Sequence, residues 1–397
     1  MKELGIFKVL KPVEKKHLIF IIIVLLNRII SPLSKRASIG WLRATGFELL
    51  TGLEEKQLHQ NRIYEAMDAL YGVLDEVMER FYQLSEGKPN LLLYDISTTF
   101  FEGNGPEQAK HGYSRDNRGD RPQILLALCI NEKGFPVYFD IFDGNVSDKS
   151  TVGKLLKVVK DRFGVEKAIF IGDRGMVCSQ NIEALIEMGF GYIVALKHIE
   201  ARQLLDEVRT NQQMELFEKR LPFTIKVEGK EKKYVLCGSE WRREDNMRRF
   251  TELLNKGEEG LMSVLEMVKN GRLKGYESVI RRAQKKLTES GAGRYFDFEY
   301  KDGEFRIIRK EQEIQKAIAL CGYYVLETTE VGMPDSEVEE NYKKLQQVER
   351  IFRELKDLIE IRPVFHWKDR RVRTHIFLCI IKYSSAVQGK IKRRRMV

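Results

Sequence analysis

Long hydrophobic runs and paired cysteines are both scarce in this sequence. The longest apolar run, Leu18–Leu26, has nine residues. That is too short to span a bilayer, and no small-residue cleavage site follows it. The five cysteines lie far apart, without a CxxC pair or a His/Cys cluster at zinc spacing. The sequence therefore disfavours a membrane protein, a disulfide-rich secreted domain and a structural zinc site. It indicates a buried helix at 18–26 and a reducing compartment.

The charge balance of the chain is basic. Its 397 residues include 68 Lys and Arg against 58 Asp and Glu, which gives a net charge of +10 and a pI near 9.1. Such a balance favours a polyanionic partner, most commonly nucleic acid, although ordinary basic proteins share it. Residues 1–50 alone hold nine Lys and Arg against three acids. This segment could dock on DNA, or equally serve as a packing or dimer module.

Apolar periodicity divides the chain into five parts. Residues 1–88 have apolar residues at three-to-four spacing, which predicts an α-helical N-terminal domain. Residues 89–200 contain strand-like runs that later alternate with helices, which predicts the first part of an α/β mixed sheet. We expect an inserted subdomain at 201–320, the last strand and a helix of the core at 321–381, and a basic, disordered tail at 382–397.

The boundaries of the expected elements follow from the same patterns. The expected strands of the sheet are 91–95, 123–130, 136–141, 167–173 and 191–196, and the expected helices between the later ones are 149–162 and 179–188. The insertion has short strand-like pieces around a charged helical middle at roughly 246–288. A further helix is expected from Pro334 to about Glu360, where Arg362-Pro363 ends it.

Three acids stand at positions where they could meet. Asp95 follows the apolar run Leu91–Tyr94, and Asp173 follows the apolar run 168–172, so each is predicted at the tip of a buried strand. Glu349 lies within the predicted helix 334–360. Carboxylate oxygens are the ligands that Mg²⁺ prefers. The three acids therefore predict a magnesium site suited to two-metal phosphodiester chemistry.

The residues around Glu349 share one helix face. Tyr342, Leu345, Glu349, Phe352 and Lys356 follow one another at steps of three or four. A carboxylate flanked by a cation and an aromatic suits a phosphate contact beside a metal ligand. The same spacing also fits an ordinary amphipathic helix whose Glu and Lys are solvated.

This spacing resembles the YREK signature, Tyr-x2-Arg-x3-Glu-x6-Lys, of bacterial insertion-sequence DDE transposases of the insertion-sequence 4 type. The chain matches the signature at Tyr342, Glu349 and Lys356, and departs from it at Leu345, where the family usually has Arg. Further similar motifs occur in the same order. They are Tyr94–Thr99, Gly112–Asp116, Pro122-Gln123, Gly144–Asp148, Gly172–Met176 and Arg362–Trp367. The resemblance covers roughly 90–200 and 320–380, and more weakly 27–46.

The resemblance implies an RNase H-like core with a β-rich insertion in the 176 positions that separate Asp173 from Glu349. It implies that Asp95, Asp173 and Glu349 bind two Mg²⁺ ions, for which Mn²⁺ would substitute. One ion would activate water and later the DNA 3′-hydroxyl, and the other would stabilise the leaving 3′-oxygen. Such an enzyme cuts the ends of its own insertion sequence, at terminal inverted repeats in double-stranded DNA, and joins the 3′ ends to target DNA. A homodimer and a prokaryotic, cytoplasmic, nucleoid-associated location are further implications.

Several cations are expected to bind DNA beside the acids. Tyr342 and Lys356 are predicted to hold the transferred-strand end through phosphate contact, with stacking on a displaced base. Lys344 or Arg353 could substitute for the Arg that is missing at position 345. Arg174, next to Asp173, is a phosphate ligand or pairs with an acid. Trp367 is expected to pack against the protein rather than to wedge between bases.

Two other functions remain open at this point. A DNA-binding remnant or inhibitor of transposition would bind the same DNA without cleaving it, and Leu345 is compatible with that hypothesis. A metal nuclease would cleave but not join. The presence of all three acids favours an active enzyme over a decayed one.

Overall fold

The computed structural model describes residues 5–46, 49, 52–85, 87–173, 178–196, 200–201, 223–227, 230–238, 240–362 and 364–395. The chain divides into two compact units. The first unit comprises residues 1–195, 225–233 and 327–397, and the second comprises 196–224 and 234–326. Each is considered by itself. The predicted domain boundaries stay a prediction, because compactness alone does not test them.

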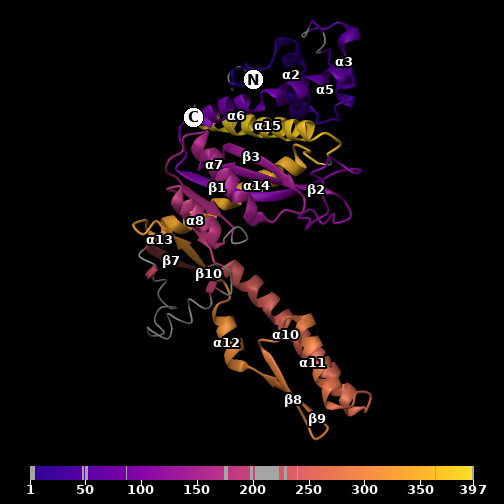
Figure 1. The fold of residues 1–397 in the computed structure, drawn as a ribbon, viewed down its shortest axis with the longest axis vertical. Helices are drawn as coiled ribbons and strands as arrows, with labels where there is room; N and C mark the ends of the chain where they lie inside the picture. The colour runs from indigo at the N-terminus through magenta and orange to yellow at the C-terminus, as the bar shows by residue number, and fades with distance from the viewer. Residues whose placement is uncertain are drawn as a thin grey trace. The chain divides into compact units, whose positions relative to one another are not determined.

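Helices and a mixed sheet make up the first unit (Figure 1). Its helices are α1 (Ile6–Val9), α2 (Lys15–Ile30), α3 (Ala37–Ala44), α5 (Gln60–Gly72), α6 (Leu74–Tyr82), α7 (Val152–Asp161), α8 (Ser179–Glu187), α13 (Asp335–Lys343), α14 (Leu345–Asp357) and α15 (Asp369–Arg395). Its strands are β1 (Leu91–Phe100), β2 (Gln123–Ile130), β3 (Pro136–Asp143), β4 (Ile169–Gly172), β5 (Gly191–Ala195) and β6 (Phe223–Val227), the last of which straddles the boundary.

The described strands of the sheet follow the order β3-β2-β1-β4-β5-β10-β7-β6, where β7 (Lys230–Gly238) and β10 (Tyr323–Thr328) run from one unit into the other. The pairs β1–β2 and β2–β3 are antiparallel, and β1–β4 and β4–β5 are parallel. Every position of β2 is buried, as expected for a sheet that is covered on both faces. The predicted RNase H-like mixed α/β core is confirmed.

Helix α15 lies between the sheet and the N-terminal helices (Figure 1). The ring of Phe377 stacks on Phe139 of β3 at 5.9 Å and meets Phe81 of α6 edge-on at 5.7 Å. The apolar run at 18–26 lies inside α2 and is mostly buried, as predicted. No helix in the described part of the chain is long and apolar enough to cross a membrane. The tail expected to be disordered instead continues α15 to Arg395, because its Lys- and Arg-rich sequence favours the helix.

Buried cations join the N-terminal helices to the chain that leaves α14. Arg28 of α2 donates to the carbonyl oxygens of Ile359 and Glu360 at 3.0 and 3.1 Å. His375 donates from Nε2 to the Ile361 oxygen at 3.2 Å, so its Nδ1 is left to accept from Lys35 Nζ at 3.2 Å. Burial, and then the charge of Arg28, lower the pKa of Lys35 to about 7. Burial also holds the pKa of His375 well below its usual value.

Two glycines allow the loop between β1 and β2 to lie close to the sheet. A Cβ at Gly112 would lie 2.2 Å from the Gly144 oxygen, and a Cβ at Gly144 would lie 2.0 Å from the Gln123 oxygen. Only glycine fits such backbone contacts. The loop is further fixed by Arg115, whose backbone N–H donates to Thr98 Oγ1 at 3.1 Å. These contacts place residues 112–116 beside β1.

The second unit has a hydrophobic core of its own. Its elements are the end of β7, α10 (Glu240–Lys269), α11 (Tyr276–Ser290), β8 (Phe296–Lys301), β9 (Glu304–Arg309), α12 (Glu311–Ala319) and the start of β10. Asp302 and Gly303 both have positive φ and form the tight turn of the β8–β9 hairpin. The expected insertion is mixed in its described part rather than β-rich, because the charged segment 240–290 favours helix.

Candidate active site

Asp95 lies in the middle of β1. The sequence had predicted it at the tip of a strand, and that prediction is wrong. The strand continues to Phe100 because residues 97–100 pair with residues 123–126 of β2. Asp95 itself is only partly exposed. Its Oδ1 accepts a hydrogen bond from the backbone N–H of Ile96 at 2.7 Å. A rigid central strand therefore holds the first carboxylate.

Asp173 follows β4 and stands beside Asp95 in the sheet register. Tyr94 of β1 pairs with Gly172 of β4 in parallel, so the next residue on each strand is one of the two acids. Neighbouring strands are about 4.8 Å apart. Asp173 is exposed, whereas Asp95 is not. The prediction is confirmed for Asp173, which follows the end of its strand, and wrong for Asp95, whose strand continues to Phe100.

Glu349 lies on the exposed side of α14. This helix packs against β1 with an adjoining side, which buries Leu345, Val348, Phe352 and Leu355 among others, so Glu349 stands at the edge of the buried face. The single helix predicted for 334–360 is divided at Lys344, where α13 ends and α14 begins one residue later. Leu345, at the position where the signature has Arg, is therefore part of the hydrophobic core of the unit.

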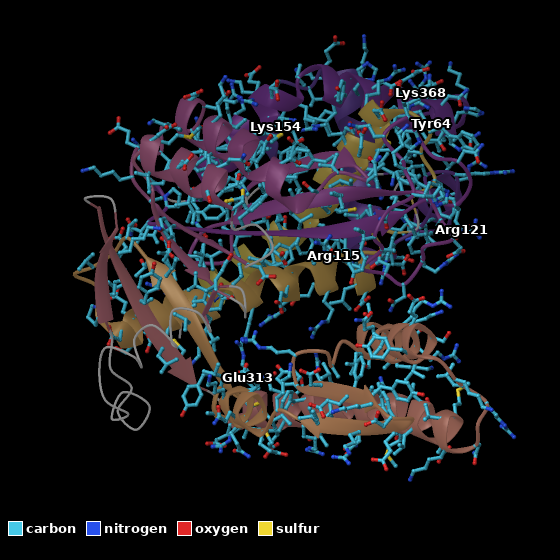
Figure 2. The ribbon with its side chains drawn as sticks, turned by 60° about the horizontal axis from the view of Figure 1, so that its bottom comes forward. Tyr64, Arg115, Arg121, Lys154, Glu313 and Lys368 are labelled. Carbon is cyan, nitrogen blue, oxygen red and sulfur yellow. The ribbon has the colours of Figure 1, made fainter. Side chains whose placement is uncertain are left out.

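One pocket of about 450 Å³ brings the three acids together. Its lining residues are Asp95, Ile96, Ser97, Arg115, Asp116, Asp173, Glu349, Phe352, Arg353, Lys356, Asp357 and Arg362. Figure 2 shows Arg115 beside the strands of the first unit. All of these residues belong to that unit, although they come from four separate stretches of sequence.

The acids influence one another electrostatically. The pKa of Asp95 is raised to about 7, chiefly by burial and further by the negative charges of Asp173 and Glu349. The Ile96 N–H and the positive charge of Arg115 act in the opposite direction. Asp95 is therefore close enough to both other acids for their charges to affect its ionisation. A cation bound among the three acids would reduce the electrostatic repulsion between the carboxylates.

The oxygen-rich donor set fits a hard divalent cation. Within the described residues, however, no three His, Cys, Asp or Glu side chains lie close enough together to hold a metal ion. Mutual repulsion of like charges favours separated carboxylates. Because Asp173 and Glu349 are exposed, their side chains can rotate without disturbing the core. Rotation of these two side chains toward Asp95 is thus what binding an ion would require.

Asp116 holds two cations at the edge of the pocket. Its Oδ1 lies 2.6 Å from Lys356 Nζ and 2.5 Å from Arg362 Nη1, and its side chain is 3% exposed. Its Oδ2 is buried without a hydrogen-bond partner among the described residues. Burial lowers the pKa of Lys356, Asp116 opposes that effect, and Arg362 and Arg115 add to it. Lys356 is therefore a clamped side chain and not a freely mobile one.

The remaining predicted DNA contacts divide into three groups. Arg353 is exposed and lines the pocket. Tyr342 is buried, and Lys344 donates to Asn341 Oδ1 at 2.7 Å. Neither residue is in the described lining of the pocket. Arg174 lies outside the described residues. The predicted contact of these four side chains with DNA stays a prediction.

Sequence reasoning assigned no role to Arg115, Asp116 or Arg362. All three lie inside motifs that resemble the transposase family, Gly112–Asp116 and Arg362–Trp367. Membership in those motifs was the only local signal, because the pairing of Asp116 with Lys356 spans 240 positions.

A mixed sheet with two acids on adjacent strands and a third on a packed helix offers carboxylate ligands of the kind that two-metal phosphoryl transfer uses. The family profile described as "Transposase DDE domain" matches residues 87–384 of this chain. The chain belongs to this family. Its members generally use divalent metal ions, and the family acts on DNA as nuclease and transferase.

Two solved structures match the chain with low scores. A piggyBac transposase, in a synaptic complex with hairpin DNA, is 8% identical with a TM-score of 0.47, over 94% of this chain and 65% of that chain. The Mos1 transposase, in a paired-end complex with the left transposon end, is 12% identical with a TM-score of 0.20, over 41% and 59% of the two chains. This chain thus spans less than two thirds of either protein, and at these scores the likeness says nothing of function. No protein of curated function matches the chain in sequence.

Proposed function

We propose that this protein is a DDE transposase of the insertion-sequence 4 type. It cuts the ends of its own insertion sequence and joins the 3′ ends to target DNA by hydrolysis and transesterification of phosphodiesters. The observation that supports this proposal best is the pocket shared by Asp95, Asp173 and Glu349, in which burial and the charges of the other two acids raise the pKa of Asp95. Such an arrangement is costly for folding, and it has a use when cations join the three acids.

Asp95, Asp173 and Glu349 would hold two Mg²⁺ ions, with Mn²⁺ as a substitute. When bound, the ions supply an activated water or 3′-hydroxyl nucleophile and stabilise the leaving 3′-oxygen. β1 and β4 fix two of the carboxylates, and the buried side of α14 fixes the third. This rigidity sets the position of the scissile phosphate, which is the main contribution that a protein makes to such chemistry.

The cations of the pocket orient the DNA. Arg353 is exposed at the pocket and contacts backbone phosphates. Lys356 and Arg362, held by Asp116, present two fixed positive charges to the same strand. Tyr342, Lys344 and Arg174 are further candidates for contact, as the signature implies. The partners are double-stranded DNA with terminal inverted repeats and a target duplex, bound by a homodimer in a prokaryotic cytoplasm.

A cleavage assay tests the proposal. The purified protein is incubated with Mg²⁺ or Mn²⁺ and a labelled duplex made from the DNA that flanks its own gene. We expect nicking at a fixed position. Asp95→Asn, Asp173→Asn and Glu349→Gln should each reduce the rate at least about a hundredfold, since each removes a charged ligand. Glu354→Gln is the control, because this glutamate of α14 pairs with Arg350 and is absent from the pocket's described lining.

The outcomes separate the functions that the sequence leaves open. A pre-nicked duplex that is joined to a second DNA indicates a transposase, and cleavage without joining indicates a metal nuclease. Binding without cleavage under every metal condition would leave a DNA-binding remnant. Cleavage that survives substitution of all three acids would refute the assignment of this pocket.

A further inference from the structure

The segment that follows α14 alternates between buried and exposed side chains. Val364 and His366 point inward, and the His366 ring lies 5.3 Å from that of His375. Phe365 and Trp367 point outward, with 61% and 64% of each residue exposed. This period of two is that of an extended chain, and the Val364 N–H donates to the Phe100 oxygen at 3.2 Å. The conformation of the segment therefore places two large aromatics on one surface.

Trp367 was expected to pack against the protein rather than to contact bases, and it does so only in part, because 64% of the residue is exposed. One edge of its ring lies near Gly103, at 3.6 Å from the position that a Cβ there would occupy. Most of the ring remains open to solvent. A large aromatic that is held on one side and open on the other suits a planar partner, because stacking needs a ring that does not move.

This aromatic pair lies close to the three-acid pocket. Arg362 lines the pocket, and Phe365 follows it by three residues. An extended chain covers about 10 Å over three residues, which equals about three base steps along one DNA strand. A base stacked on Phe365 or Trp367 would thus belong to one of the first few nucleotides beside the scissile bond.

The charges around the pair favour nucleic acid over another apolar surface. Segment 362–371 holds Arg362, Lys368, Arg370 and Arg371 against the single acid Asp369. Asp116 pairs with Arg362, and Asp68 pairs with Arg370 and Arg371, so Lys368 contributes most to the local positive charge. Figure 2 shows Lys368 on the same side of the first unit as Arg121, which belongs to the loop that adjoins the aromatic segment. Basic side chains interleaved with exposed aromatics are typical of surfaces that bind unpaired nucleotides.

We propose that Phe365 and Trp367 form a stacking surface for unpaired bases at the DNA end whose phosphodiester enters the three-acid pocket. The proposal rests on the proposed function and adds to it the part of the substrate that this surface takes. A paired base inside a duplex offers no free face, so the surface selects frayed or unpaired ends over continuous duplex.

Tryptophan emission provides a direct test. The chain has three tryptophans, and the double substitution Trp41→Phe and Trp241→Phe leaves Trp367 as the only one. This protein is titrated with a gene-flanking duplex whose last three nucleotides are unpaired, and with a longer duplex that is paired through the same site. We expect the unpaired end to quench the emission of Trp367 and the continuous duplex to leave it largely unchanged.

Affinity measurements on variants complete the test. Trp367→Ala should weaken binding of the unpaired end by roughly fivefold to a hundredfold, the range for loss of one base–aromatic stack. Trp367→Phe should recover most of that loss, and Phe365→Ala should weaken binding to a lesser degree. Phe7→Ala, which removes another exposed aromatic of the first unit, should have no effect. Equal melting temperatures will establish that the variants fold.

Three results would overturn the inference. In the first, the unpaired end does not quench the emission of Trp367 and binds Trp367→Ala as tightly as it binds the unsubstituted protein. Another is equal quenching by both duplexes. The third is loss of a dimer in Trp367→Ala without DNA, which would assign the surface to a second copy of the chain. If the unsubstituted protein fails to cleave while quenching persists, the proposed function fails and the stacking surface stands.

Discussion

Replacement of Asp116 should separate DNA binding from DNA cleavage. Asp116 is buried and pairs with Lys356 and Arg362 at 2.6 and 2.5 Å, so that its single negative charge is shared between two cations. Asp116→Asn keeps an oxygen that can accept a hydrogen bond but removes the negative charge, and Asp116→Ala removes both. Two cations at the pocket edge then lose their partner and become available to DNA phosphates. We therefore expect tighter DNA binding together with slower cleavage.

The size of each effect follows from the geometry. Truncating one partner of a buried pair costs about 3–5 kcal/mol, and since Lys356 and Arg362 are partly exposed we expect about 3 kcal/mol of lost stability for Asp116→Ala. Asp116→Asn should lose about 1–2 kcal/mol. Two freed cations should steepen the dependence of log Kd on log salt by up to about 1.8, at about 0.9 for each phosphate neutralised.

The assay compares salt dependence with single-turnover cleavage. Asp116→Asn should bind the gene-flanking duplex at least as tightly as the unsubstituted protein at low salt, yet cleave it about tenfold to a hundredfold more slowly, because Lys356 is no longer fixed. Asp75→Asn is the control, since this acid is 86% exposed, pairs with Arg162 at 2.9 Å and is absent from the pocket's described lining. Weaker binding with an unchanged salt slope would refute the reasoning and leave Asp116 a merely structural residue.

Two further predictions concern folding. The stability of the protein should rise with pH between about 7 and 10, because the unfolded chain keeps the proton of Lys35 until its pKa near 10.4 while the folded chain releases it at about 7. Lys35→Met should remove that slope and raise the free energy of unfolding at pH 7 by a few kcal/mol, as urea titrations at several pH values would detect. Gly112→Ala should cost roughly 3 kcal/mol or more because its Cβ would meet backbone. Gly119→Ala, in the same loop with no neighbour within 4 Å, should be nearly neutral in the same titrations, and equal losses would contradict the packing argument.

The sheet could be predicted because its signals are local. Buried strands need apolar residues at nearly every position, and β2, predicted at 123–130, has them from Ile124 to Ile130. The acids Asp95 and Asp173 could be found in the same way, since each ends an apolar run. By contrast, the extension of β1 to Phe100 depends on its pairing with β2, to which the polar residues 97–99 give no local clue.

Long-range electrostatics could not be predicted from the pattern. Lys356 was predicted to hold a DNA strand by phosphate contact, which stays a prediction, but its pairing with Asp116, 240 positions earlier, was not foreseen. Nothing near Asp116 in the sequence distinguishes it from an acid of a solvated loop. The exposure of Trp367 was missed for a similar reason. Trp is usually buried, and only the bridge between Phe101 and Val364 sets the side on which its ring lies.

The pocket separates its three acids from Lys356 and Arg362, and this separation has a physical consequence. Three carboxylates attract any nearby cation, and a Lys or Arg that paired with them would compete with a metal ion for the same oxygens. Lys356 lies seven residues after Glu349 on α14, about 10 Å along the helix axis. Asp116 holds it at that distance together with Arg362. A fourth carboxylate therefore keeps Lys356 and Arg362 away from the three acids, so that these two cations do not compete with metal ions and stay available to phosphate.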